Sequence, residues 1–119
     1  MDSILQSIKL LLGVNPEYDY FNEELIMHIN SVLMILNQLG VGVEGFHIEG
    51  INETWDQFLG EKSDLLVGVK SYVHAKVRLM WDPPTSSAVS DALNRSVNEF
   101  EWRLNVRAES WASYNTTVF

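Results

Sequence analysis

The sequence predicts an all-α fold, a small helical bundle of about four to five helices with a glycine-rich loop or short hairpin arm near residues 40–51 and an extended C-terminal tail. Apolar residues recur at spacings of three and four over most of the 119 residues, which places them on one face of a helix. Glycine or proline ends each of the first four such segments. The 46% apolar and 20% charged content is typical of one globular domain.

The first helix is expected over residues 2–12, where the apolar spacing continues up to Gly13. Ser3 can cap its first turn, and Gln6 follows three residues later, as in a capping box. Asp2 is an alternative cap. This segment should pack its apolar face against the longer helices that follow.

The second helix is expected over residues 22–39 and should end at Gly40. Glu23 and Glu24 fall in its first turn, where the helix dipole favours negative charge. Residues 40–51 then carry four glycines between isolated apolar residues, which indicates a loop or a short hairpin arm.

A short helical segment is expected to end at Gly60, with Asn52 as its cap. Trp55 stands among apolar neighbours there and is expected to join the core. The next helix is expected over residues 63–81, with one apolar stripe from Leu66 to Met80.

The stretch WDPPTSSAV, residues 81–89, interrupts the helical pattern. Proline lacks a backbone donor, and Pro84 disfavours helical backbone at Pro83. We expect a rigid elbow that sets the angle between the helices before and after it. A plain interhelical turn is the minimum interpretation of the same residues.

The last helix is expected to end near Leu104, with Thr85, Ser86 or Ser87 as its cap. Its apolar face should comprise Val89, Leu93, Val97, Phe100 and Leu104, with Ala92 as a close-approach position. Helical spacing fades after Asn105, although aromatic residues continue, which is unusual for a disordered tail. The chain is therefore divided into a helical domain over residues 1–105 and a docking tail over residues 106–119.

The net charge of −8 is concentrated in residues 1–66, which hold eleven acids and two bases. Such a chain does not bind nucleic acid by neutralising phosphates. The absence of cysteine excludes disulfides and thiolate metal sites. No apolar stretch is long enough for a transmembrane helix, so no membrane association is expected.

Motifs for catalysis and metal binding are missing from the sequence. None of His28, His47 and His74 has a histidine partner at helical spacing, and His28 shares a helix face only with Glu24. There is no nucleophile motif or phosphate-binding glycine loop. We therefore expect no catalytic residue, no metal, no cofactor and no enzymatic activity.

Tryptophan and arginine are enriched in protein interfaces, and both types occur near the corner and in the last third of this chain. Basic residues there alternate with acids, which favours mixed-charge surfaces over a nucleic-acid site. Trp102 and Trp111 are therefore our candidates for contacts outside the domain.

Five stretches form a set whose order and spacing are specific: ILQSIKLLLGVNPEYDYF, LIMHINSVLMILNQLGVG, TWDQFLG, VKSYVHAKVRLMWDPPTSSAV and FEWRLN. They span nearly Ile4 to Asn105. On these stretches the chain resembles the head–tail connector, or adaptor, family of tailed bacteriophages, in the form common in phages of Gram-positive bacteria.

The resemblance implies a structural virion protein of the neck, made in the host cytoplasm, that forms a ring of about twelve copies beneath the portal. The ring would extend the DNA channel, through which DNA passes without sequence-specific binding, and would receive the next neck or tail-completion protein. In this family the C-terminal region typically reaches the portal. The resemblance thus implies contacts with the portal protein or a neighbouring copy, and the partner-binding residues expected on this basis are Trp81, Asp82, Pro83, Pro84, Trp102, Arg103, Arg107, Trp111, Tyr114 and Phe119. The alternative is a small cytosolic helical protein-binding regulator acting as a dimer.

Overall fold

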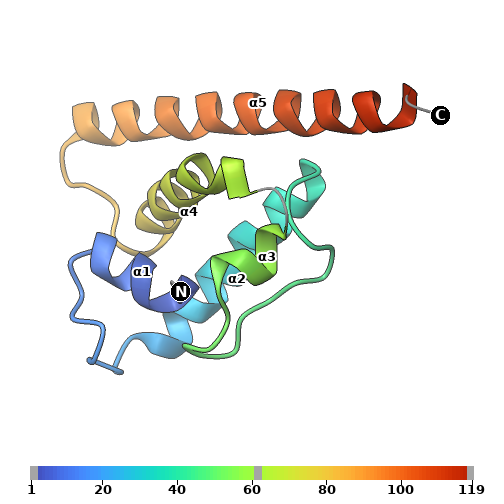
Figure 1. The fold of residues 1–119 in the computed structure, drawn as a ribbon. Helices are drawn as coiled ribbons and strands as arrows, with labels where there is room; N and C mark the ends of the chain where they lie inside the picture. Colours follow the sequence, from blue (N-terminus) through green and yellow to red (C-terminus); the bar gives the residue numbers. More distant parts are fainter. Residues whose placement is uncertain (1–2, 61–62, 118–119) are drawn as a thin grey trace.

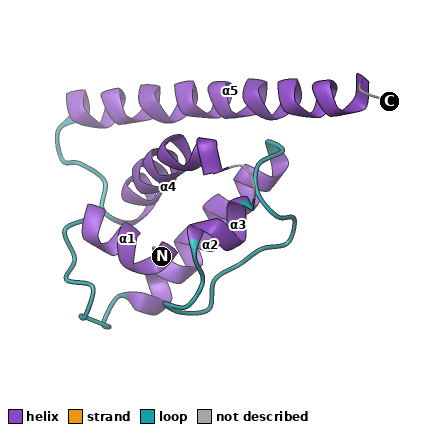
Figure 2. Ribbon diagram, viewed as in Figure 1, coloured by secondary structure: helices purple, strands orange, loops and turns teal. Residues whose placement is uncertain are grey.

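The computed structural model describes residues 3–60 and 63–117, without the side chains of residues 63 and 109–117. Figures 1 and 2 show helices and loops throughout this part of the chain. The helices are α1 (Ile4–Leu11), α2 (Asn22–Gln38), α3 (Trp55–Leu59), α4 (Leu66–Trp81) and α5 (Ser87–Thr117), with a 3-10 turn, η1 (Ser63–Leu65), before α4. The all-α prediction is confirmed, and residues 40–54 form a loop rather than a hairpin.

The core lies between α1, α2, α3 and α4, and it is made of the apolar stripes that the helical spacing predicts. Leu25, Ile29 and Leu33 of α2 and Val73 and Val77 of α4 are completely buried. Burying one such side chain contributes roughly 1.5–3 kcal/mol to the free energy of unfolding, so these residues of α2 and α4 are a main source of the stability of the fold.

Trp55 of α3 is 1% exposed, which confirms its predicted place in the core. Its indole N–H donates a 2.8 Å hydrogen bond to the hydroxyl of Ser7. The buried tryptophan therefore has a partner for its polar group, and it fastens α3 to α1.

Side-chain caps fix the starts of three helices. The Ser3 hydroxyl accepts the Gln6 N–H at the start of α1, as predicted. The cap of α3 is Thr54 and not Asn52, because the helix begins later than expected, and Thr54 forms a reciprocal capping box with Gln57. At the start of α5 the Ser86 hydroxyl accepts the backbone N–H of Val89.

Lys9 is completely buried within the apolar face of α1. Its ammonium donates to the carbonyl oxygens of Pro16 and Tyr18 at 2.9 Å and 2.6 Å, and to the side-chain oxygen of Asn22 at 2.8 Å. Three neutral acceptors thus use its three donors. The α1–α2 connection is held against α1 by this one side chain.

The last helix, expected to end near Leu104, continues to Thr117. Figure 1 shows α5 lying across α4 as an outer layer and extending past the other helices. The backbone N–H and C=O groups of a helix pair with each other, so α5 continues although the apolar spacing of the sequence fades after Asn105. The docking role of residues 106–119 stays a prediction.

Only part of the expected apolar face of α5 is buried. Val97 and Leu104 are 2% and 4% exposed, whereas Val89 is 53% exposed and Ala92 is also exposed. Ala92 is therefore not a close-approach position. That role belongs to Ala108, whose Cβ would lie 3.3 Å from a Cβ added at Gly40.

The molecule is flat, with principal extents of 50 × 35 × 19 Å. In residues 3–60 and 63–117, no helix is long and apolar enough to cross a membrane. The same residues bring no three potential metal ligands together.

Candidate interaction surfaces

The aromatic residue before the corner is anchored in the body of the protein. Trp81 is half-buried, and its ring meets the ring of Phe21 edge-on, with 5.2 Å between centroids. Phe21 also contacts the rings of Tyr18 and Tyr20, which are 51% and 78% exposed. The structure thus gives Trp81 a role in fixing the corner, with exposed aromatic rings beside it.

The break at the corner is where the prolines predict it. The backbone leaves the helix at Asp82, where φ is −145° and ψ is 70°, and the Asp82 N–H still donates to the Arg78 carbonyl. Pro83 is exposed and Pro84 is half-buried. These side chains are placed at the surface or near it, and a partner contact there stays a prediction.

Trp102 on the outer side of α5 is 68% exposed. It lies fifteen residues after the start of α5 at Ser87, about 22 Å along the helix axis at 1.5 Å per residue. The structure therefore does not join Trp102 and the corner into one site. They belong to two separate surfaces of the molecule.

The two arginines near Trp102 make ion pairs within the molecule. Arg103 contacts Glu99 at 2.6 Å, one turn earlier on α5. Arg107 pairs with Asp64 of η1 and so ties α5 to the body. Both arginines are largely exposed, and exposed pairs of this kind contribute little to stability.

Three predicted partner-binding residues lie near the C-terminus. The backbone of Trp111 and Tyr114 belongs to α5, while their side chains lie outside the described residues. Phe119 lies outside them altogether. Contacts of these three residues with a partner stay predictions.

Polar contacts on one side of α5 hold it against α4 and the end of α2. The Tyr72 hydroxyl donates a 2.7 Å hydrogen bond to the Glu101 carboxylate, and Lys76 lies 3.8 Å from the same carboxylate. Burial, followed by the bond to Glu101, raises the pKa of the Tyr72 hydroxyl. The Asn105 amide donates to the Leu39 carbonyl at 3.3 Å.

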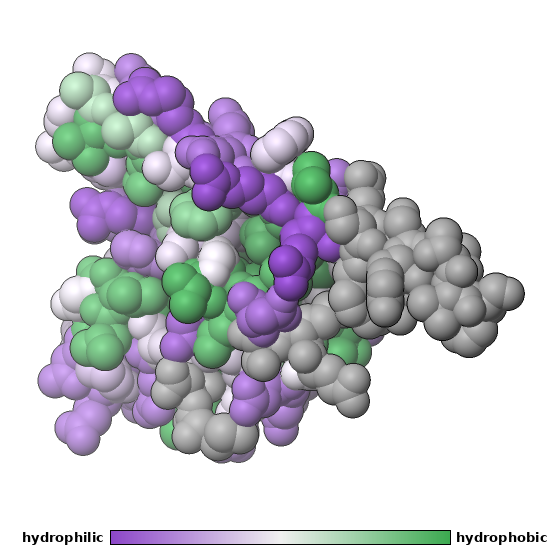
Figure 3. Space-filling model, turned by 45° about the horizontal axis from the view of Figure 1, so that its top comes forward, coloured by the Kyte–Doolittle hydropathy of each residue, from purple (hydrophilic) through white to green (hydrophobic). Residues whose placement is uncertain are grey.

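On the other side of α5, an open groove runs between α1, α4 and α5. We call it the α5 groove and define it by Leu11, Val67, His74, Leu93, Ser96 and Phe100, which line a hollow of about 430 Å³. A second hollow of about 250 Å³ continues past Phe100 to Arg103 and Arg107. Figure 3 shows apolar residues in green below the polar side chains of α5 on this side.

The α5 groove has apolar walls that no described residue covers. Val67 is 78% exposed and Leu11 is 47% exposed. Arg78 lies one turn after His74 on the same face of α4. Burial, and then the charge of Arg78, lowers the pKa of the His74 imidazole, against a hydrogen bond with the Leu11 backbone that raises it. The Nε2 atom of His74 is buried and has no hydrogen-bond partner among the residues that the structure describes.

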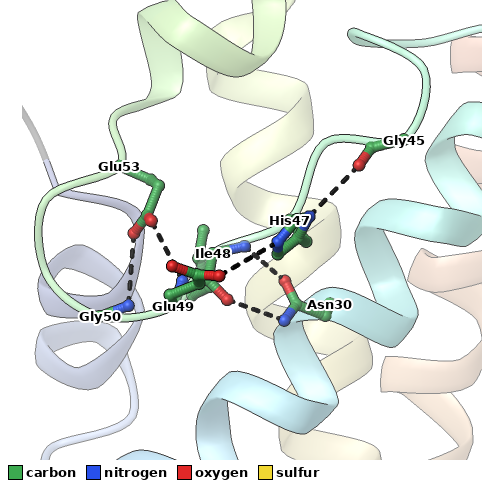
Figure 4. Close-up of polar contacts among 7 residues, drawn as sticks. All are labelled: Asn30, Gly45, His47, Ile48, Glu49, Gly50 and Glu53. Atoms are coloured by element: carbon green, nitrogen blue, oxygen red, sulfur yellow. Dashed lines mark hydrogen bonds and ion pairs between the residues drawn. The ribbon is translucent and has the colours of Figure 1, made fainter.

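The loop over residues 41–51, which we call the arm, is held by side chains of α2. The Asn30 amide donates to the Ile48 carbonyl at 2.9 Å and its oxygen accepts the Ile48 N–H at 2.7 Å (Figure 4). Seven residues later, the Asn37 amide donates to the carbonyls of Val41 and Val43 and its oxygen accepts the Gly45 N–H. The backbone of the arm therefore has fixed partners.

The end of the arm is closed by the carboxylate of Glu53, which lies two residues after it. Both oxygens of Glu53 accept backbone N–H groups, from Glu49 at 3.1 Å and from Gly50 at 3.3 Å (Figure 4). His47 lies 3.5 Å from the Glu49 carboxylate. This network leaves the carboxylate of Glu49 largely exposed at the surface.

Glycine is required where the arm meets α3. Gly42 has a φ of +84°, and a Cβ added there would lie 2.2 Å from the ring of Phe58. Phe58 is completely buried. The close approach of the Gly42 backbone to this ring thus sets the path of the arm over the core.

The sequence analysis missed both the arm's hydrogen-bond network and the α5 groove. Two asparagines seven residues apart on one helix, Asn30 and Asn37, share a helix face and could have indicated a bound loop. Val67 stands off the apolar stripe of α4 and could have indicated a second, exposed apolar surface.

A family model described as phage connector protein matches residues 4–110 of the chain. No curated protein and no solved structure matches it significantly. The matched range includes every helix except the last turns of α5. It ends close to Ala108, which is buried against the body and is the last residue whose side chain the structure describes.

Proposed function

The chain belongs to the phage connector protein family, and we propose that it acts as a subunit of a ring beneath the portal that joins the capsid vertex to the tail. Its family gives it a structural role in the phage particle, as a head–tail connector. Beyond this role, we propose the ring itself, its twelve-fold match to the portal, and the attachment of a further neck or tail-completion protein. The family match is the observation that carries this proposal.

The length of α5 supports a docking role for its C-terminal end. The backbone of residues 109–117 continues the helix past Ala108, which packs on the body. At 1.5 Å per residue, this segment reaches about 13 Å further along the axis. Residues 110–119 contain no charged residue, which is unusual for a helix that contacts only water. We therefore assign this end to the portal contact.

Charge supports the proposed place of the ring around DNA. Residues 1–66 hold eleven acids and two bases, and Lys9, one of these two bases, is completely buried. Carboxylates near a channel repel DNA phosphates, so DNA would pass without adhering. The exposed Glu23 and Glu24 at the start of α2 are among the acids available for this role.

The portal contact is tested by co-expressing the chain with portal protein and measuring co-purification. A chain that ends at Ala108 keeps the packing described above, whereas a cut at Asn105 would remove Ala108 and the Arg107–Asp64 pair. We expect the shorter chain to fold, with unchanged thermal unfolding, and to lose portal binding. Full-length Trp111→Ala with Tyr114→Ala serves as a matched variant that keeps the helix length. Undiminished binding by the chain ending at Ala108 would contradict the assignment.

The corner is tested separately, with Pro83→Ala combined with Pro84→Ala. The double variant should retain most of its stability, because Pro83 is exposed and Pro84 is half-buried. Its assembly on the portal should fail, because the angle between α4 and α5 is no longer fixed by the prolines. Electron microscopy of the complex provides the readout, and intact rings from this variant would refute the elbow.

A further inference from the structure

We propose that the arm of one copy docks in the α5 groove of the next copy. This inference rests on the proposed ring and names the two surfaces that would form its subunit contact. A ring needs a heterologous contact between two different surfaces of the same chain. The arm and the α5 groove share no residue, so one copy can use both at once.

Both surfaces expose apolar side chains that no described residue covers. On the arm, Val43 is 50% exposed and Ile51 is 48% exposed. In the groove, Val67 is 78% exposed and Leu11 is 47% exposed. Joining the two surfaces would remove these side chains from water, at roughly 25 cal/mol for each Å² of apolar area buried.

The charges of the two surfaces are complementary. The arm carries Glu44 and Glu49, with Glu53 close after it, and it contains no lysine or arginine. The groove side carries Lys70, Arg78, Arg103 and Arg107. Arg103 and Arg107 pair with Glu99 and Asp64 on the same side, so four bases against these two acids leave an excess of positive charge. Opposite charges across an interface direct association and select its register.

The arm is also prepared for docking in its present shape. Asn30, Asn37 and Glu53 satisfy its backbone through seven hydrogen bonds. A segment that is already ordered loses little conformational entropy on binding. The arm would therefore enter the groove as a preformed wedge, with Glu44 and Glu49 on its exposed surface.

Disulfide trapping tests the contact directly, because the chain contains no cysteine. Val43→Cys places a thiol on the arm, and Ser96→Cys places one in the groove; both positions are exposed. The double variant, concentrated under mild oxidation, should form a ladder of covalent multimers. Each single variant should stop at dimers. Trapping accumulates even short-lived contacts, so a double variant without a ladder overturns the proposal.

Charge reversal provides an independent test. Glu44→Lys with Glu49→Lys, added to the double-cysteine chain, should abolish the ladder, and Arg78→Glu with Arg103→Glu should do the same. Mixing the two reversed chains should restore it, because each arm then meets a groove of opposite charge. No recovery on mixing would contradict the assigned pairing. Portal co-purification of the unmodified chain does not depend on these results, so the docking can fail while the connector role stands.

Discussion

The arm and α5 both lie at the surface, but they keep their shapes in different ways. The arm has no regular structure, and side chains from α2 and Glu53 bind its backbone. α5 satisfies its own backbone over 31 residues and needs only a narrow buried stripe to stay on the body. Tertiary hydrogen bonds therefore order the arm, and local ones order α5. Substitutions should separate these two kinds of order.

Gly42→Ala is expected to be the most destabilising change in the arm. The added Cβ meets the buried Phe58 ring at 2.2 Å, and the φ of +84° is unfavourable for alanine. Overpacking and backbone strain together should cost about 4 kcal/mol in free energy of unfolding. Gly45→Ala is the matched control, since its φ is +78° and its Cβ meets nothing within 4 Å. Urea unfolding should show a loss of about 1–2 kcal/mol for the control, and equal losses would refute the close approach.

Leu104→Ala tests the buried stripe of α5. Leu104 is 4% exposed and its Cδ2 atom lies 3.7 Å from a Cβ added at Gly68. Removing it should lower the free energy of unfolding by about 3 kcal/mol. Trp102→Ala, two residues earlier and 68% exposed, should change stability by less than about 0.5 kcal/mol. Similar effects of the two substitutions in urea unfolding would mean that α5 is not held by this stripe.

Asn30→Ala tests whether the arm can lose its order while the rest of the molecule stays folded. It removes two hydrogen bonds to the backbone of Ile48, which is 1% exposed, and should cost about 2 kcal/mol. Hydrogen exchange should accelerate in residues 41–51 and stay slow in α4. Asn94→Ala is the control, because the Asn94 amide donates to the Ser90 carbonyl within α5 and lies outside the arm. Unchanged exchange in the arm of Asn30→Ala would show that other contacts order it.

The smallest expected effect is on the pH dependence of stability, through His74 in the α5 groove. Because burial and Arg78 lower the pKa of His74, the folded protein favours the neutral imidazole. The neutral His74 imidazole therefore contributes fully to stability above the ordinary histidine pKa of about 6.5. This contribution is lost as the pH falls below that value, because the unfolded chain takes up the proton more readily than the folded chain. In His74→Asn, stability measured from about pH 7 to about pH 5 should fall less than in the unchanged chain. Parallel curves would contradict this role for His74.

The sequence predicted what depends on helical periodicity. The stripes of α2 and α4 are continuous, so their bounds agree within a few residues with those expected, and Pro83 and Pro84 mark the corner correctly. The end of α5 was placed at Leu104 and lies at Thr117, because a helix keeps its backbone hydrogen bonds where the apolar spacing of its sequence has faded. The exposed Ala92 was misplaced for a related reason, since spacing alone cannot tell where along α5 the contact with α4 begins.

The candidate surfaces were harder to predict than the fold. Trp102 and Trp81 were both expected at partner contacts; Trp102 is exposed on α5, whereas Trp81 packs on Phe21. Whether Trp81 also meets a partner stays a prediction. The arm depends on Asn30 reaching Ile48, eighteen residues away, and such pairs carry no periodic signal. The α5 groove is formed by three helices, so only their packing shows that Val67 lies beside Phe100.

The corner at residues 82–86 acts on a long lever. A straight helix of 31 residues extends about 46 Å. A rotation of about 5° at the corner, if the helix swung as a rod, would displace its far end by about 4 Å, more than the length of a hydrogen bond. The position of the distant end therefore depends on how firmly the angle of α5 is fixed. Two prolines, an anchored tryptophan and the contacts of α5 with α4 fix that angle.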